Sequence, residues 1–274
     1  MEVHSVTIEH KSNATYKIYP IGDVHLGTRH CWEEGIKAKI NEIKKDPDAL
    51  WVGIGDMAEF ITPSDPRWSA DSVAEWIDLK EDDVANDQKN AVVRLLYPIK
   101  DKCLGMIEGN HEAKYHKFSH SYIHKNICEA LGVHNLGSTC WLTLRFKRKG
   151  STESHVINCV IAHGTGGATT KGYKLTKLNR FMDYWSDKAQ IFMYGHIHDI
   201  IIDTHKPKLE VDDTGEITEK VKVGAVTGCW FRTYTKGGQP SYGESALFPP
   251  TTLGCPVFEI KLVRDGRPEI SVKG

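Results

Sequence analysis

Apolar residues in this chain gather into short runs that stop at glycine and polar residues. Runs of about four to eight mainly apolar residues predict strands buried on both faces of a sheet, and a polar residue at the end of a run marks where the chain leaves the sheet. Strands of this kind are expected at 19–24, 49–56, 103–107, 155–161 and 191–194.

Other segments show helical spacing. In 33–45, the residues Ile36, Ile40 and Ile43 lie on one face, with Lys and Glu on the other, which predicts an amphipathic helix covering a sheet. Further helices are expected at 72–79, 83–96, 121–131 and 175–189, further strands at 3–8, 16–20, 141–147, 200–206, 208–211, 219–227 and 257–262, and polar turns at 11–14, 148–150, 212–215 and 264–267.

Residues of metal-binding type follow the ends of five of these strands. α/β sheets carry their chemistry at the carboxyl ends of strands, and in extended chain residues two apart point to the same side, so Asp23 and His25 are expected to face one site. Taken alone, Asp56 fits a capping Asp equally well, and a lone His is more often a packed or surface residue than a metal ligand. Taken together, carboxylate, amide and imidazole groups suit a divalent transition metal. The residues are Asp23, His25, Asp56, Asn110, His163, His196 and His198.

Composition narrows the function classes. The chain has 274 residues, and Lys plus Arg (35) nearly balances Asp plus Glu (36), so it is not globally basic like an electrostatic nucleic-acid binder. Its seven cysteines include no Cys-x-x-Cys pair, which argues against a zinc ribbon and a disulfide framework. With no signal peptide pattern and no apolar run of membrane-spanning length, we expect a soluble, cytoplasmic protein with no membrane partner.

The motifs Gly22–His25, Gly55–Asp56, Gly109–Glu112, His163–Gly164 and Gly195–His198 resemble, in type and order, those of the calcineurin-like metallophosphoesterase superfamily. The resemblance covers roughly residues 19–199. It implies an α/β fold, a four-layer α/β/β/α sandwich of two mixed sheets flanked by helices. We expect one domain over residues 1–274, with a helical insertion at about 57–100, and leave the oligomeric state open.

The resemblance also implies a site with two metals at the edge of the sheets. Asp23, His25 and His198 would hold one metal, Asn110, His163 and His196 the other, and Asp56 would bridge both. Two such ions clamp a phosphate and activate a water as hydroxide. The ligand types favour Mn, with Fe, Zn or Ni as alternatives. His111 would contact the scissile phosphate as the catalytic residue, and Asp199 and Glu112 are either partners of the histidines or ordinary exposed acids.

Three features bear on the substrate. Lys171 and Lys174 begin a segment of four cations that either contacts a polyanion or forms a solvated helix face. Arg29 and His30, just after the first motif, are expected near a phosphate. The segment 230–234 either stacks on bases or packs locally.

We expect hydrolysis of phosphodiesters, in nucleic acid (DNA or RNA) or nucleotides. The alternatives are a phosphomonoesterase acting on protein or a small molecule, and a noncatalytic scaffold. Glu108 stands where protein phosphatases of this superfamily usually have Arg, which tells against a phosphatase.

Overall fold

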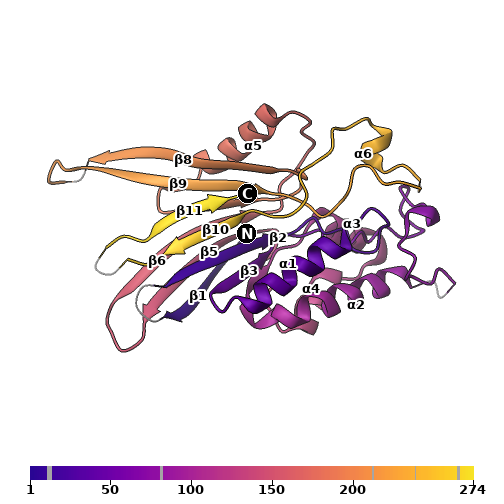
Figure 1. Cartoon of the computed structure of the whole chain (residues 1–274), viewed down its shortest axis with the longest axis horizontal. Coiled ribbons are helices and arrows are strands. Elements are labelled where there is room, and N and C mark those ends of the chain that lie inside the picture. The colour runs from indigo at the N-terminus through magenta and orange to yellow at the C-terminus, as the bar shows by residue number, and fades with distance from the viewer. Residues whose placement is uncertain (11–13, 81–82, 212, 238, 264–265) are drawn as a thin grey trace.

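Two mixed β-sheets pack face to face, and helices cover the outer face of each (Figure 1). The computed structural model describes residues 1–274 except 11–13, 81–82, 212, 238 and 264–265. The arrangement confirms the predicted α/β fold with four layers, α/β/β/α.

One of the two sheets in the described part of the chain has five strands. Its strands are β2 (Thr15–Ile21), β3 (Ala49–Gly53), β4 (Cys103–Met106), β10 (Val257–Lys261) and β11 (Glu269–Lys273). Their order is β11-β10-β2-β3-β4, with β2, β3 and β4 parallel and β10 antiparallel to both β2 and β11. The carboxyl ends of the three parallel strands therefore meet at one edge.

A six-stranded sheet lies against it in the described part of the chain. Its strands are β1 (Glu2–His10), β5 (Thr139–Arg148), β6 (Ser154–Ala162), β7 (Ile191–Tyr194), β8 (Ile200–Val211) and β9 (Ile217–Thr227). In the order β1-β5-β6-β7-β9-β8, the central strands β6, β7 and β9 are parallel. The ends of β6 and β7 thus also share an edge.

The helices divide between the two outer faces. They are α1 (Glu33–Lys45), α2 (Val84–Leu96), α3 (Asn110–Ser119), α4 (Ile123–Leu131), α5 (Lys171–Asp183) and α6 (Tyr242–Ser245), with 3-10 turns at Ala70–Ser72 and Tyr97–Lys102. Apolar residues of α1, α2 and α4 pack on the five-stranded sheet, and those of α5 pack on the six-stranded sheet.

Alternation along the buried strands produces these layers. Neighbouring residues of a strand point to opposite faces. In β2, Ile18 belongs to the core between the sheets, while Tyr19 packs among the helices. In β7, Ile191 lies between the sheets and Phe192 packs with α5. Strands buried on both faces account for the continuous apolar runs of the sequence.

The prediction of a helix at 72–79 is wrong. Only Ala70–Ser72 forms a 3-10 turn, and the chain that follows runs beside the loop after β2. The amide of Ala74 donates to the carbonyl of Gly27, and the carbonyl of Ser72 accepts from the amide of Arg29. Because these backbone groups pair with another segment, they do not form helical hydrogen bonds.

Other helix boundaries also differ. The helices at 33–45 and 83–96 are confirmed, with Asp83 as the N-cap of α2. The helix predicted at 121–131 begins at Ile123, and the one predicted at 175–189 begins at Lys171, where Thr170 caps it, and ends at Asp183. α3 was not predicted, because few of its residues are apolar.

The strand predictions hold with three differences. The strands predicted at 16–20 and 19–24 are one strand, β2, which ends at Ile21. The two strands at 200–206 and 208–211 are one strand, β8, because an edge strand tolerates the proline at position 207. β11 was not predicted. The predicted turns at 11–14, 212–215 and 264–267 include residues 11–13, 212 and 264–265, which lie outside the described residues.

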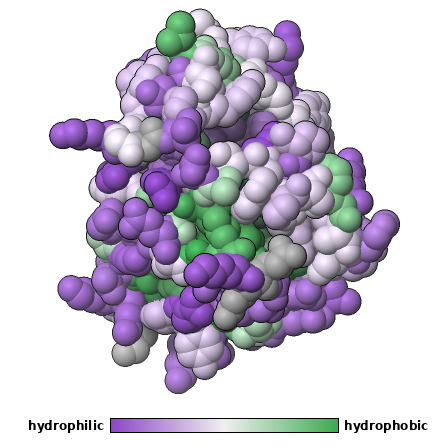
Figure 2. Space-filling model, turned by 90° about the vertical axis from the view of Figure 1, so that its right-hand side faces the viewer, coloured by the Kyte–Doolittle hydropathy of each residue, from purple (hydrophilic) through white to green (hydrophobic). Residues whose placement is uncertain are grey.

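Two segments border the loop after β2. A bridge between Thr28 and Val73 holds the segment between β3 and β4, and a bridge between Cys31 and Phe231 holds the segment after β9. Both segments lie on the right-hand side of Figure 1, and the view from that side shows an exposed apolar area bordered by hydrophilic side chains (Figure 2). Within the described residues, no helix combines the length and the apolar character needed to cross a membrane.

Packing between the sheets predicts a large effect for Phe146 on β5. This residue is fully buried, and its ring centroid lies 5.0 Å from that of Tyr16 on β2. Phe146→Ala is expected to lower the free energy of unfolding by about 3–5 kcal/mol, because it leaves a cavity. Val156→Ala on β6, at a position that is 41% exposed, is the control and should change it by less than about 0.5 kcal/mol. Equal losses in urea unfolding would contradict this packing.

Candidate metal centre

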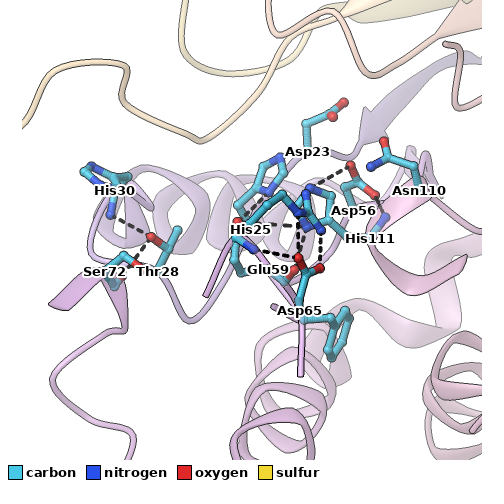
Figure 3. A network of polar contacts seen from close by, with 12 residues as sticks. Asp23, His25, Thr28, His30, Asp56, Glu59, Asp65, Ser72, Asn110 and His111 are labelled. Atoms are coloured by element: carbon cyan, nitrogen blue, oxygen red, sulfur yellow. Dashed lines mark hydrogen bonds and ion pairs between the residues drawn. The ribbon is translucent and has the colours of Figure 1, made fainter. Parts of the chain in front are cut away.

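Loops after five strands of the two sheets meet at one edge. The predicted ligands follow β2 (Asp23, His25), β3 (Asp56), β4 (Asn110), β6 (His163) and β7 (His196, His198). Hydrogen bonds continue past the strand ends, because the amides of Asp23 and Val24 donate to the carbonyls of Gly55 and Asp56, both at 2.9 Å. Figure 3 shows Asp23, His25, Asp56 and Asn110 gathered around one region.

The backbone turns sharply at most of these residues. The angle φ is 47° at Asp23, 50° at His25, 50° at Asp56, 69° at His196 and 50° at His198. This left-handed conformation costs roughly 1–3 kcal/mol for a residue other than glycine, and Asp and His are among the residues found there most often. Asp23 and His25 do converge, but the predicted reason, alternation in extended chain, is wrong: a tight turn brings them together.

One cluster consists of Asp23, His25 and His198, whose ligand atoms all lie within 4.8 Å of one another. His25 Nδ1 is 2.8 Å from a carboxylate oxygen of Glu59 and therefore carries the proton that it donates. Its Nε2 then has a lone pair, which faces Nε2 of His198 at 3.0 Å. Nε2 of His198 also lies 3.2 Å from Oδ1 of Asp23. Three donor atoms thus point at one place.

A second cluster consists of Asp56, His163 and His196. His163 Nδ1 lies 2.7 Å from the carbonyl oxygen of Ile54 and donates its proton there, so Nε2 is the nitrogen left to bind a metal ion or a second proton. That atom faces Oδ1 of Asn110 at 3.0 Å and Oδ2 of Asp56 at 3.1 Å. His196 Nδ1 is buried without a hydrogen-bond partner. Acceptor atoms that face one another in this way are satisfied by a cation.

The electrostatics of the clusters also favour a cation. Burial by itself would raise the pKa of Asp56, but His163 and His111 outweigh it and hold the pKa well below its usual value. Burial would likewise lower the pKa of His163, yet Asp56 and Asp23 raise it to about 10, so these carboxylates hold a proton at Nε2, and a metal ion bound there would take the place of that proton. Burial and His163 lower the pKa of His196 to about 4, so that ring stays neutral, as a metal ligand must. These residues fit divalent metals, and the site lacks thiolates.

His111 lies beside both clusters. Its Nδ1 is 2.5 Å from the carbonyl oxygen of Glu59 and donates to it, so Nε2 faces Oδ2 of Asp56 at 4.0 Å. Its backbone amide donates to Oδ1 of Asp56 at 2.8 Å. Burial would lower the pKa of His111, but Asp56 and Glu59 outweigh it and raise the pKa. The imidazole is thus oriented with one nitrogen toward the place where the ligands converge.

Sequence reasoning missed Glu59, which holds two of these histidines. Its carboxylate accepts from His25, and its main-chain carbonyl accepts from His111 (Figure 3). Burial would raise the pKa of Glu59, but His111 and His25 lower it to about 2, so it is a carboxylate. The available signal was its place three residues after Asp56, on the loop that leaves β3.

Glu112 joins the loops after β3 and β4. It is fully buried, and its carboxylate accepts from the amides of Gly109 and Asp56 at 3.0 Å each and from that of Met57 at 2.8 Å. Neither of the two predictions for Glu112, a partner of a histidine or an ordinary exposed acid, matches this placement, because its carboxylate is buried and accepts from backbone amides. A Cβ atom at Gly109 would overlap the main chain of Asp56, so glycine allows this close approach.

The predicted substrate residues do not converge as the ligands do. Arg29 is exposed, and its Nε donates to the carbonyl of Val73. His30 is buried, bonds to Thr235 and lies with its ring 5.3 Å from that of Phe231. Lys171 is exposed at the first position of α5.

Lys174 is buried rather than exposed. Its ammonium group lies 2.8 Å from Oδ2 of Asp199, which is buried as well. Neither of the two predictions for Lys174, a contact to a polyanion or a solvated face, matches this placement. Asp199 also bonds to Lys174 and to the amide of Ile200, rather than to a histidine as predicted. The pair ties α5 to the loop that carries His198.

The three amides bonded to Glu112 generate a stability prediction. Glu112→Ala leaves them buried and unpaired, and each loss costs about 1–3 kcal/mol, so the free energy of unfolding should fall by at least about 2 kcal/mol. Glu112→Gln retains one acceptor oxygen and should lose less. Glu129→Ala, which removes an exposed ion pair with Lys125, is the control and should lose less than about 0.5 kcal/mol in urea unfolding. A loss for Glu112→Ala as small as the control's would refute this role.

Comparisons with known proteins add little. No protein-family model matches the sequence, and no curated protein matches it. Among solved structures, one similar chain is a conserved uncharacterized protein of Streptococcus pneumoniae, named as a predicted phosphoesterase. It is 12% identical, the match covers 95% of this chain and 99% of that one, and the TM-score is 0.34. At this TM-score the likeness says nothing about the site.

Proposed function

We propose that this protein is a metal-dependent phosphoesterase that hydrolyses phosphodiester bonds in nucleic acid or nucleotides. The observation that carries the proposal is the convergence of carboxylate, amide and imidazole donors on two adjoining clusters. Asp56 supports a pair of ions, because its carboxylate lies within 4.8 Å of donor atoms of His163 and His196 on one side and of His25 on the other. The resemblance of the five sequence motifs to metallophosphoesterases points the same way.

Seven residues would hold two divalent ions, with Mn favoured and Fe, Zn or Ni as alternatives. Asp23, His25 and His198 would bind one ion, Asn110, His163 and His196 the other, and Asp56 both. When bound, such ions supply positive charge for a phosphate group and lower the pKa of water toward neutrality. The protein's part is to fix the rings: Glu59 and the carbonyl of Ile54 set the tautomers of His25 and His163.

His111 supplies the proton for the leaving group. Its Nδ1 proton stays bonded to the carbonyl of Glu59, so Nε2 is the atom that takes up a proton and passes it on. A positioned acid of this kind typically contributes about 10²- to 10⁴-fold in rate.

A diester is favoured over a monoester because of Glu108. A phosphate monoester carries more negative charge than a diester, and the replacement of the Arg usual in protein phosphatases by Glu108, two residues before Asn110, removes a positive charge that would favour the monoester. Exposed cations at Arg29 and Lys171 remain available to a longer polyanion, whereas Lys174 is paired with Asp199. The matched esters bis-p-nitrophenyl phosphate and p-nitrophenyl phosphate separate the two classes.

Metal content tests the pair of ions. After chelation and reloading with Mn, the protein is expected to retain about two Mn per chain, since the two clusters adjoin. Asp56→Asn should retain at most one, and Asp78→Asn, at an exposed position of the segment between β3 and β4, should retain both. Elemental analysis after gel filtration provides the measurement. Retention of no Mn, Fe, Zn or Ni by the unaltered protein would end the proposal.

Activity tests the role of His111. The Mn-loaded protein is expected to hydrolyse bis-p-nitrophenyl phosphate faster than p-nitrophenyl phosphate, and His111→Ala should lower kcat by about 10²- to 10⁴-fold. His134→Ala, at an exposed position, is the control and should keep its activity. Faster hydrolysis of the monoester would show that the protein is a phosphomonoesterase rather than a phosphodiesterase. Hydrolysis of neither ester with any of the four metals would favour a scaffold.

A further inference from the structure

An arginine that the sequence motifs do not include is fixed close to the candidate metal centre. Arg67 lies in the segment between β3 and β4, and Asp65 binds it at three points. Nε of Arg67 donates to Oδ1 of Asp65 at 3.1 Å, Nη2 donates to Oδ2 at 2.7 Å, and the backbone amide donates to Oδ1 at 2.9 Å. The guanidinium group is therefore held in one orientation.

The pair is buried on one side only. The Asp65 side chain is 6% exposed, whereas that of Arg67 is 38% exposed. A guanidinium group has five N–H donors, and Asp65 uses two of them, one on Nε and one on Nη2. Among the described residues, no acceptor is bonded to Nη1. The edge formed by Nη1 and Nη2 is thus free to bind a second anion with two parallel hydrogen bonds.

The free edge belongs to a group near His111. Figure 3 shows Asp65 next to Glu59, the residue that orients both His25 and His111. The bond with Asp65 raises the pKa of Arg67, and the charges of Glu59 and Asp56 add to that effect. Charges act on one another in this way only over short distances.

We propose that Arg67 binds a non-bridging oxygen of the substrate phosphate on the side of His111, with Asp65 as the residue that positions it. Arginine suits this task, because its planar fork matches two phosphate oxygens and it keeps its charge at any working pH. This role rests on the proposed function. It gives the segment between β3 and β4 a purpose beyond covering the sheet: it delivers a fixed positive charge to the substrate.

Stability alone does not account for the pair. An exposed ion pair contributes little to folding, yet here the carboxylate is buried to bind an arginine whose other edge faces outward. The carboxylate of Asp65 also accepts from the backbone amide of Arg67. The backbone amide of Asp65 donates to the carbonyl of Thr62, and its carbonyl accepts from the amide of Trp68, so hydrogen bonds hold the turn on both sides. Rigid placement of a charged donor is what stabilisation of a phosphate requires.

Binding of inorganic phosphate to the Mn-loaded protein provides the first test. Arg67→Met should raise the dissociation constant, measured by isothermal titration calorimetry, by about tenfold or more, because two charge-assisted hydrogen bonds are lost. Arg67→Lys should recover only a small part, since lysine has no fork. Arg94→Met, at an exposed position of α2, is the matched control and should leave phosphate binding unchanged. Unchanged Mn content excludes an indirect effect through the metals.

Kinetics with bis-p-nitrophenyl phosphate provides the second test. Arg67→Met should lower kcat/KM by about 10²-fold, and Asp65→Asn, which keeps the shape of the side chain, should lower it less. In the double variant, Asp65→Asn should add no further loss, because Asp65 acts through Arg67. Additive losses would show that Asp65 acts independently and would overturn its positioning role.

The outcomes separate this role from the proposed function. If the unaltered protein hydrolyses no phosphoester, the proposed function fails, and phosphate binding still decides the role of Arg67. If the unaltered protein is active and Arg67→Met matches Arg94→Met in both phosphate affinity and kcat/KM, the role of Arg67 is refuted while the proposed function stands.

Discussion

The structure depends on holding the polar atoms of the candidate metal centre at short distance from one another. Nε2 of His25 faces Nε2 of His198, and Nε2 of His163 faces Oδ1 of Asn110, each at 3.0 Å. Atoms of these types lie this close in a buried place only when a proton or a metal ion lies between them. The backbone around them is strained as well, since five of the ligand residues have left-handed φ angles. The surrounding structure must therefore hold the arrangement.

Buried acids that contact the candidate ligands or their loops hold the arrangement in place. Glu112 joins the loops after β3 and β4 through three backbone amides, and Glu59 orients His25 with its side chain and His111 with its carbonyl. Lys174 and Asp199 join α5 to the loop after β7. Behind them, the core between the two sheets fixes the strand ends from which the loops start. The ligands can thus be strained because their supports are rigid.

The segments outside the sheets border this rigid centre. The segment between β3 and β4 brings the pair of Asp65 and Arg67, and the segment after β9 brings Phe231, whose ring lies 5.3 Å from that of His25. As far as their residues are described, neither segment adds a strand to the sheets. Segments of this kind vary more easily than a core, so they are where a substrate preference is expected to reside.

The sequence by itself determined the strands, the covering helix at 33–45 and the residues at the strand ends, because burial on two faces and chemical type are written in short stretches of sequence. It did not determine the helix beginning at Asn110, because few of the residues there are apolar. It also did not determine the absence of a helix at 72–79 or the burial of Lys174, because each depends on a partner far along the chain, Gly27 and Asp199. Glu59 likewise became visible only through its contacts. Tertiary structure decided which polar groups meet, since pairing energies depend on distances that no local pattern encodes.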